Sequence, residues 1–303
     1  RHAGISIGNS KVFSGLRLNF RDRHVERING INLTLWKSNQ NKEAVVNGIS
    51  MGVMPTAGYI RGINVGIAGV AAEHELRGIT LGLVGAGSGD RLCGLGIGGL
   101  GLGSGGDMRG IFLGGLGVGS GANMTGILFG GLGAGAGGDM TGIAIGGLGV
   151  GAGNDMTGLM FGGFGAGAGG DMTGIAIGGL GAGAGGNMSG ITLALLGAGA
   201  GENMNGLAIA GLGAGAGEKM TGIVIGGLGA GAPLVTGLAL GGFAAGGFEI
   251  QGSTVALGWV KVNDEGYLKG FTFSAFNQIK GDLSGLSVGI VNYAWHVNGI
   301  QIG

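Results

Sequence analysis

The chain has 303 residues, and 84 of them are glycine, several times the roughly 7% that proteins average. Sixteen basic residues balance sixteen acidic ones and the mean hydropathy is +0.48, which excludes a highly charged, disordered chain and disfavours a nucleic-acid-binding protein. Only two prolines and no glycine at every third position exclude collagen, and the single cysteine, Cys93, excludes an internal disulfide.

The first segment, residues 1–93, is predicted to form degenerate turns of a repeat with an N-terminal cap. A glycine followed by apolar residues recurs here at uneven intervals, for example at Gly30, Gly48 and Gly62. Charged residues gather in residues 1–27, as expected for a terminal unit that differs from the repeats it covers.

The second segment, residues 94–236, is a regular 16-residue repeat. Methionine marks eight copies, at Met108, Met124, Met140, Met156, Met172, Met188, Met204 and Met220. Residues 140–155, MTGIAIGGLGVGAGND, represent the unit. The third segment, residues 237–303, is predicted to be a series of degenerate C-terminal turns.

Within one repeat the apolar residues alternate with period two, which is typical of β-strands. The alternation slips at a glycine pair, so each unit is predicted to contain two short strands joined at a glycine corner. We expect the large apolar residues to lie inside and glycine to lie outside. The predicted core residues are Met140, Ile143, Ile145, Leu148 and Val150, with counterparts in other copies such as Ile177.

These features predict an all-β fold, a β-solenoid of about twenty coils in which identical residues stack about 4.8 Å apart. The alternative is an antiparallel outer-membrane β-barrel. The solenoid is favoured because every predicted turn has the same composition, whereas a barrel has two different ends.

Asp or Asn recurs at the predicted turn, and a ladder of carboxylates could hold calcium. The candidate residues are Asp107, Asp139, Asp155 and Asp171. Asparagine interrupts the series at Asn123, so turn formation is the favoured explanation. A parallel ladder of Thr and Ser resembles the hydroxyl ranks of ice-binding solenoids.

The bare glycine face is the most informative functional feature. Glycine in a strand gives up side-chain packing, so the absent side chains are expected to permit close approach of another surface. Gly149, Gly165 and Gly181 are therefore predicted to form a self-association face.

No catalytic motif, cofactor motif or metal-binding cluster stands out, and the glycines lack the context of a phosphate-binding loop. The prediction is a non-enzymatic protein without cofactor or small-molecule substrate. Cys93 is predicted to fill the core rather than to act as a reactive thiol.

The segment Leu286-Ser-Val-Gly-Ile-Val-Asn-Tyr-Ala294 resembles the units of bacterial surface repeat proteins of the leptospiral type. The central GGLGAGAGGDMTGI array is similar to glycine-rich secreted or envelope repeat proteins. This resemblance implies an exported protein at the bacterial cell surface and no enzymatic activity.

The predicted function is therefore structural: an extracellular or cell-surface protein that self-associates into a homo-oligomer, filament or layer. One alternative is an outer-membrane or envelope protein, although membrane contact is not favoured. Another is a module that binds an ice, calcium or carbohydrate surface.

Overall fold

The computed structural model describes residues 3–39 and 41–303. In this part of the chain the regular structure is all β-strand, and it forms a parallel β-solenoid of about 18 turns with about 16 residues per turn. The predicted solenoid is confirmed, and the antiparallel arrangement is wrong because the strands pair in parallel. Arg1 and His2 of the predicted N-terminal cap lie outside the described residues. Two compact units divide the chain, unit 1 over Arg1–Gly153 and unit 2 over Asn154–Gly303.

Unit 1 contains the strands β1 (Ala3–Ile7), β2 (Val12–Asn19), β3 (Arg27–Thr34), β4 (Val45–Gly52), β5 (Thr56–Gly66), β6 (Gly69–Gly82), β7 (Gly85–Ser88), β8 (Arg91–Gly98), β9 (Gly101–Ser104), β10 (Asp107–Gly114), β11 (Gly117–Ser120), β12 (Met124–Gly130), β13 (Gly133–Ala136), β14 (Met140–Gly146) and β15 (Gly149–Ala152).

Unit 2 contains the strands β16 (Met156–Gly162), β17 (Gly165–Ala168), β18 (Met172–Gly178), β19 (Gly181–Ala184), β20 (Met188–Ala194), β21 (Gly197–Ala200), β22 (Asn203–Ala210), β23 (Gly213–Ala216), β24 (Lys219–Gly226), β25 (Gly229–Gly231), β26 (Leu234–Gly241), β27 (Ala244–Ala256), β28 (Trp259–Phe273), β29 (Phe276–Val288), β30 (Val291–Val297) and β31 (Ile300–Ile302).

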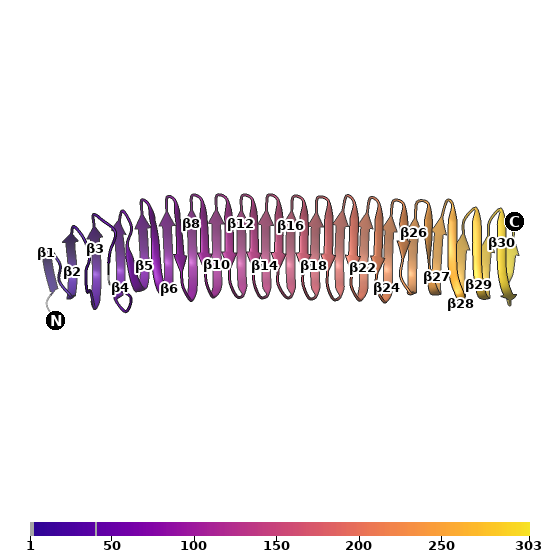
Figure 1. The fold of residues 1–303 in the computed structure, drawn as a ribbon, viewed down its shortest axis with the longest axis horizontal. Helices are drawn as coiled ribbons and strands as arrows, with labels where there is room; N and C mark the ends of the chain where they lie inside the picture. Colours follow the sequence, from indigo (N-terminus) through magenta and orange to yellow (C-terminus); the bar gives the residue numbers. More distant parts are fainter. Residues whose placement is uncertain (1–2, 40) are drawn as a thin grey trace. The chain divides into compact units, whose positions relative to one another are not determined.

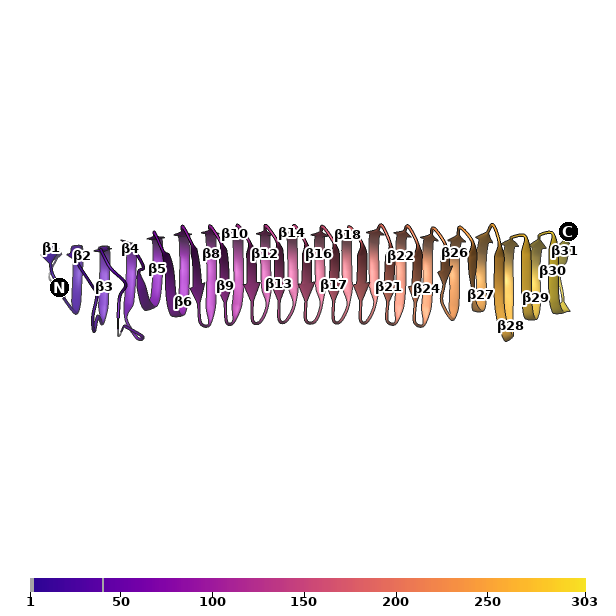
Figure 2. The same cartoon turned by 45° about the horizontal axis from the view of Figure 1, so that its top comes forward.

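Each regular turn has a long strand, a glycine-containing corner and a short strand. In unit 1, β12 pairs with β14 and β13 pairs with β15, so that the long and short strands stack separately along the solenoid (Figures 1 and 2). Equivalent residues pair with one another, as Met124 does with Met140 and Gly133 with Gly149. The two strands per repeat and the glycine corner agree with the sequence prediction.

The interior is smaller than the sequence analysis predicted. Met140 and Val150 are buried, with 1% and 4% exposure, so their predicted positions are confirmed. Ile143 and Leu148 are 39% and 45% exposed, and Ile145 is half-buried beside them. The prediction that these last three residues form the core is wrong.

Glycine explains this inversion, because it brings the two layers of strands very close together. A Cβ atom built on Gly146 would lie only 2.0 Å from the carbonyl oxygen of Gly149 on the short strand. Since alternate residues face the same side, the interior receives Met140 and the fully buried Ala144, while Ile143 faces out. The position of the glycine corner, rather than hydropathy, therefore decides which of the two alternating sets of residues faces the interior.

Glycine is required in the middle of each long strand for a separate reason. Gly142 has φ of 120° and Gly126 has φ of 130°, a conformation that other residues rarely adopt. A Cβ atom on Gly142 would also lie 2.1 Å from the carbonyl oxygen of Gly126 in the adjoining turn. Both the strain and the close stacking of turns require glycine at this position.

Candidate functional site: the outer faces of the solenoid

The outward side chains of the long strands form continuous apolar rows. In unit 1, Ile111, Ile127 and Ile143 pair in register and are 39–43% exposed. Next to them lies a second row that includes Leu113 and Phe129, which are 38% and 44% exposed. A folded protein seldom exposes branched apolar side chains in such a regular array.

The same rows recur in unit 2, together with a third row at the corner. We call these rows the apolar face of each unit. In unit 2 the apolar face comprises the long-strand residues Leu159, Phe161, Ile175, Ile177, Ile191, Leu193, Leu207, Ile209, Ile223 and Ile225 and the corner residues Phe164, Leu180, Leu196, Leu212 and Leu228. The strands β16, β18 and β20 carry no charged residue. This face is therefore both apolar and uncharged.

The outer positions of the short strands form a second surface, which we call the glycine face. Gly149, Gly165 and Gly181 begin the strands β15, β17 and β19, and the residue after each of them is buried. A Cβ atom on Gly165 would meet the nearest atom of another turn, the Gly181 carbonyl oxygen, at 3.5 Å, an ordinary contact distance. Gly165 and Gly181, where the nearest atom of another turn would lie 3.5 and 3.6 Å from a Cβ atom, thus have space for a side chain, and none is present.

The Asp and Asn residues at the turns bind the backbone of the adjoining turn. In unit 1, Asn123 donates its backbone N–H to Asp107 Oδ1 at 3.3 Å, and Asp139 donates to Asn123 Oδ1 at 2.8 Å. In unit 2, Asp171 donates to Asp155 Oδ1 at 2.8 Å. Within the described residues, no three His, Cys, Asp or Glu side chains gather as a metal site would require. The ladder joins turns together, and asparagine serves this purpose as well as aspartate.

Cys93 does not fill the core, and that prediction is wrong. Leu92 occupies the inner position, and Cys93 pairs in register with Arg77 on one side and Arg109 on the other. Its side chain is half-buried on the outer side of β8. Burial raises the pKa of the Cys93 thiol, which disfavours the reactive thiolate.

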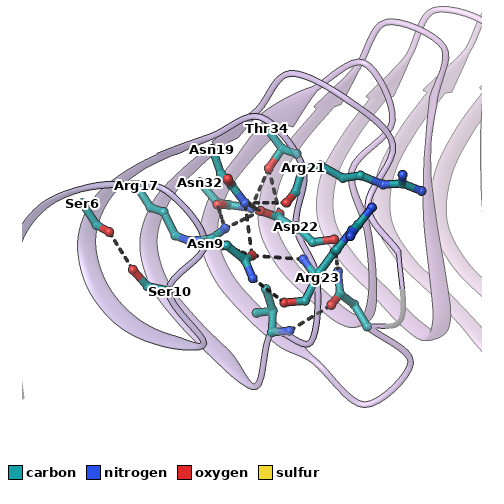
Figure 3. Close-up of polar contacts among 12 residues, drawn as sticks. Ser6, Asn9, Ser10, Arg17, Asn19, Arg21, Asp22, Arg23, Asn32 and Thr34 are labelled. Atoms are coloured by element: carbon teal, nitrogen blue, oxygen red, sulfur yellow. Dashed lines mark hydrogen bonds and ion pairs between the residues drawn. The ribbon is translucent and has the colours of Figure 1, made fainter.

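A buried polar cluster in unit 1 is the feature that the sequence analysis missed (Figure 3). Arg17 is 0% exposed and donates a hydrogen bond to Asp22, which is 4% exposed. Asp22 also accepts hydrogen bonds from Asn32 at 2.8 Å, from Thr34 at 2.7 Å and from Asn19 at 2.8 Å. The sequence signal was present: Arg17 and Asn32 each follow a repeat glycine by two positions, where regular repeats place Ala144.

The cluster holds Asp22 in its ionised form. Burial alone would raise the pKa of Asp22, but hydrogen bonds from Asn32, Asn19 and Thr34 and the charge of Arg17 outweigh it. The pKa of Asp22 therefore lies below its usual value of 3.8. The Arg17–Asp22 ion pair lies inside the solenoid away from solvent, although Arg17 Nε has no hydrogen-bond partner, so this cluster supports the fold rather than a reaction.

No family model, curated protein or solved structure matches the chain. The described residues contain no helix long and apolar enough to cross a membrane.

Proposed function

We propose that this protein is a non-enzymatic structural protein, located outside the cell or at the bacterial cell surface, that self-associates into a fibre or layer. The observation that carries the proposal is the apolar face, because its large apolar side chains point outward from the long strands in regular rows. The resemblance of residues 286–294 to bacterial surface repeats supports the location.

The apolar face is large enough to matter. In unit 1 the outer rows run through the turns from β3 to β14, about 40 Å along the solenoid and about 15 Å across it, or roughly 600 Å². The largest apolar patch on a typical monomer is about 300–600 Å², and a stable interface buries about 800 Å² per partner. One unit therefore provides most of the area that a stable contact requires.

A second copy of the chain is the occupant that fits this face. In unit 2 the strands β16, β18 and β20 carry no charged residue, so two copies of this part of the apolar face meet without stranding an ion, whereas in unit 1 Arg77 and Arg109 lie beside the apolar rows. Both copies have the same spacing between rows, about 4.8 Å, so the ridges of one match the grooves of the other over many turns. The glycine face, where Gly165 and Gly181 lie, provides a second, flatter contact for lateral growth.

Single-charge variants on unit 2 test the proposal by sedimentation velocity and electron microscopy. Ile175→Lys and Ile191→Lys place a charge on the apolar face, Gly165→Arg places one on the glycine face, and Asn154→Lys places one on an exposed turn as the control. We expect the combined Ile175→Lys, Ile191→Lys variant to reduce assembly at least tenfold with an unchanged circular dichroism spectrum, and Asn154→Lys to have no effect.

The outcomes separate the two faces. If Gly165→Arg is the only variant that loses assembly, the interface lies on the glycine face, as the sequence analysis predicted. A monomeric unaltered protein that floats with lipid vesicles would overturn self-association and favour a membrane-associated envelope protein. Because apolar contacts weaken on cooling, we also expect fewer assemblies at 4 °C than at about 25 °C.

A further inference from the structure

The glycine face changes abruptly at the C-terminal end of unit 2. In the paired short strands, one outer column runs from Gly229 through Ala244 to Trp259, Phe276 and Val291. The column beside it runs from Gly231 through Gly246 to Lys261, Gln278 and Tyr293. Over the strands β28 to β30, bare glycine is thus replaced by a terrace that carries the aromatic side chains Trp259, Phe276 and Tyr293 and the polar side chains Lys261 and Gln278.

This terrace contains a pocket of about 500 Å³. Its lining includes the aromatic side chains Trp259, Phe276 and Tyr293, which are 43%, 55% and 51% exposed. Phe243 closes one side, and its ring lies against Gly258, where a Cβ atom would approach it to 3.0 Å. The volume and the aromatic lining are those of a small-molecule or oligomer-binding site rather than of a flat contact surface.

The polar groups of the pocket are neutral and firmly placed. Tyr293 OH accepts a hydrogen bond from Trp295 Nε1 at 3.0 Å, which orients the phenol and leaves its proton available for a ligand. Asn277 is buried, with its amide bound to Val288 O and Asn292 Oδ1, and so supports the floor. Gln278 adds an amide that can both donate and accept.

We propose that this aromatic terrace binds a neutral polysaccharide chain. No charged side chain lines the pocket, so an ionic ligand would lose its hydration without gaining a partner. A purely apolar ligand would leave the Tyr293 hydroxyl and the Gln278 amide unpaired. A pyranose ring has an apolar C–H face that packs on an aromatic ring and a rim of hydroxyls for hydrogen bonds.

The geometry favours an extended β-linked chain. Trp259 and Phe276 pair directly in adjoining turns, so their backbones lie about 4.8 Å apart. Successive sugar rings of such a chain recur at a similar interval, so each turn can meet one ring. A second hollow of about 550 Å³, lined by Gly231, Gly246 and Lys261, adjoins the terrace on the glycine side and gives room for further sugars.

Titration calorimetry and tryptophan fluorescence with cellohexaose and chitohexaose test this inference. We expect the unaltered chain to bind at least one of them and Trp259→Ala to weaken binding at least tenfold. Tyr293→Phe, which keeps the ring, should weaken it several-fold. The matched control is Phe273→Ala, because Phe273 is 46% exposed on the same strand, β28, but does not line this pocket.

Absence of binding of both hexasaccharides to the unaltered chain would overturn the proposal, and so would equal losses in Trp259→Ala and Phe273→Ala. Tyr293→Phe is not expected to misfold. If its affinity is unchanged, the Tyr293 hydroxyl does not bind the ligand, which would count against a sugar. The terrace continues the short-strand columns beyond Gly229 and Gly231, so sugar binding and self-association are tested by different variants, Trp259→Ala for the first and Ile175→Lys, Ile191→Lys for the second.

Discussion

The first turns of unit 1 and its regular turns have the same backbone but different interiors. At one inner position of the long strands, two residues after the repeat glycine, the early turns place polar residues and the regular turns place apolar ones. The series is Arg17, Asn32, Ser50, Asn64 and Thr80, then Gly96, Phe112, Leu128 and Ala144. The backbone hydrogen bonds between turns thus define the solenoid. The interior that they enclose can be filled by polar or by apolar side chains.

The two fillings are stabilised in different ways. Apolar side chains such as Leu128 need only fit the space, whereas each buried polar group needs a partner. Arg17 and Asp22 are the charged side chains that are buried among the described residues, and they form an ion pair that Asn32 and Thr34 complete with hydrogen bonds to Asp22. The polar turns should therefore depend strongly on individual residues, and the regular turns should depend on volume.

The largest effect is expected from a charge placed inside a regular turn. Ala176→Asp in β18 would bury an unpaired carboxylate, because Ala176 is 2% exposed, and should destabilise the fold by several kcal/mol. Ile177→Asp, which the predicted core would have made equally severe, should change stability by less than about 1 kcal/mol because its side chain faces out. Denaturant titration of both variants checks this, and equal losses would contradict the assignment of inner and outer positions.

Breaking the buried ion pair is expected to come next. Arg17→Met leaves Asp22 without its cation and should cost about 3–5 kcal/mol, seen as rapid hydrogen exchange in β2 and β3. The double variant Arg17→Met, Asp22→Leu should recover only part of the loss, because it removes the unpaired charge but leaves Asn32 and Thr34 without the carboxylate that accepts their hydrogen bonds. A double variant as unstable as the single one would show that the early turns require a polar interior.

A substitution at Gly96, where the polar interior gives way to the apolar one, should have a smaller effect on stability, and a second substitution should partly reverse it. Gly96 is buried, and a Cβ atom there would lie 2.8 Å from Phe112 Cδ1 and 3.1 Å from Leu102 Cδ1. Gly96→Ala should therefore destabilise unit 1 by about 1–3 kcal/mol through overpacking. Adding Phe112→Leu should restore part of this in a thermal melt. If the second substitution adds to the damage instead, the aromatic ring is not the cause.

The early turns should also be sensitive to acid. Because the pKa of Asp22 is lower in the folded chain than its usual value of 3.8, its ionisation stabilises the fold fully above that value. This contribution is lost as the pH falls below 3.8 through the lower folded pKa. Hydrogen exchange should show β2 and β3 opening before β12 and β14 as the pH falls from 5 to 2.5, and Asp22→Asn should abolish the pH dependence of opening in β2 and β3.

The smallest effect is expected at the surface of the early turns. The pKa of His74 is raised, chiefly by its hydrogen bond to Asp90 at 2.8 Å and also by Glu43. The protonated imidazole therefore adds stability that is present below its usual pKa of 6.5 and is lost as the pH rises through the higher folded value. NMR titration of His74 should give a lower pKa in Asp90→Asn, whereas an unchanged pKa would exclude this pair as the cause.

The repeat predicts much of the fold, but it does not predict which residues face the interior and which face outward. Period-two alternation limits the interior to one of two sets, either Met140 with Ala144 or Ile143 with Ile145. Hydropathy favoured the second set, yet Gly146 must face the short strand, because a Cβ atom there would lie 2.0 Å from the Gly149 carbonyl oxygen, and Met140 and Ala144 share its side of the long strand. The terminal features were missed for a related reason: Arg17 and Trp259 belong to degenerate repeats, where their inner or outer position follows only from the register.

The sequence by itself determined a parallel stack of 16-residue turns, because only a repeating backbone explains methionine, glycine and Asp or Asn at fixed intervals. The tertiary structure alone decided what each turn encloses and what it exposes. The reason is physical: the gap between the two strand layers depends on backbone contacts such as Gly146 to Gly149, which form only when the turn closes. This contact places Gly146 and Ala144 inside and turns Ile143 and its counterparts outward, and so creates the apolar face on which the proposed self-association depends.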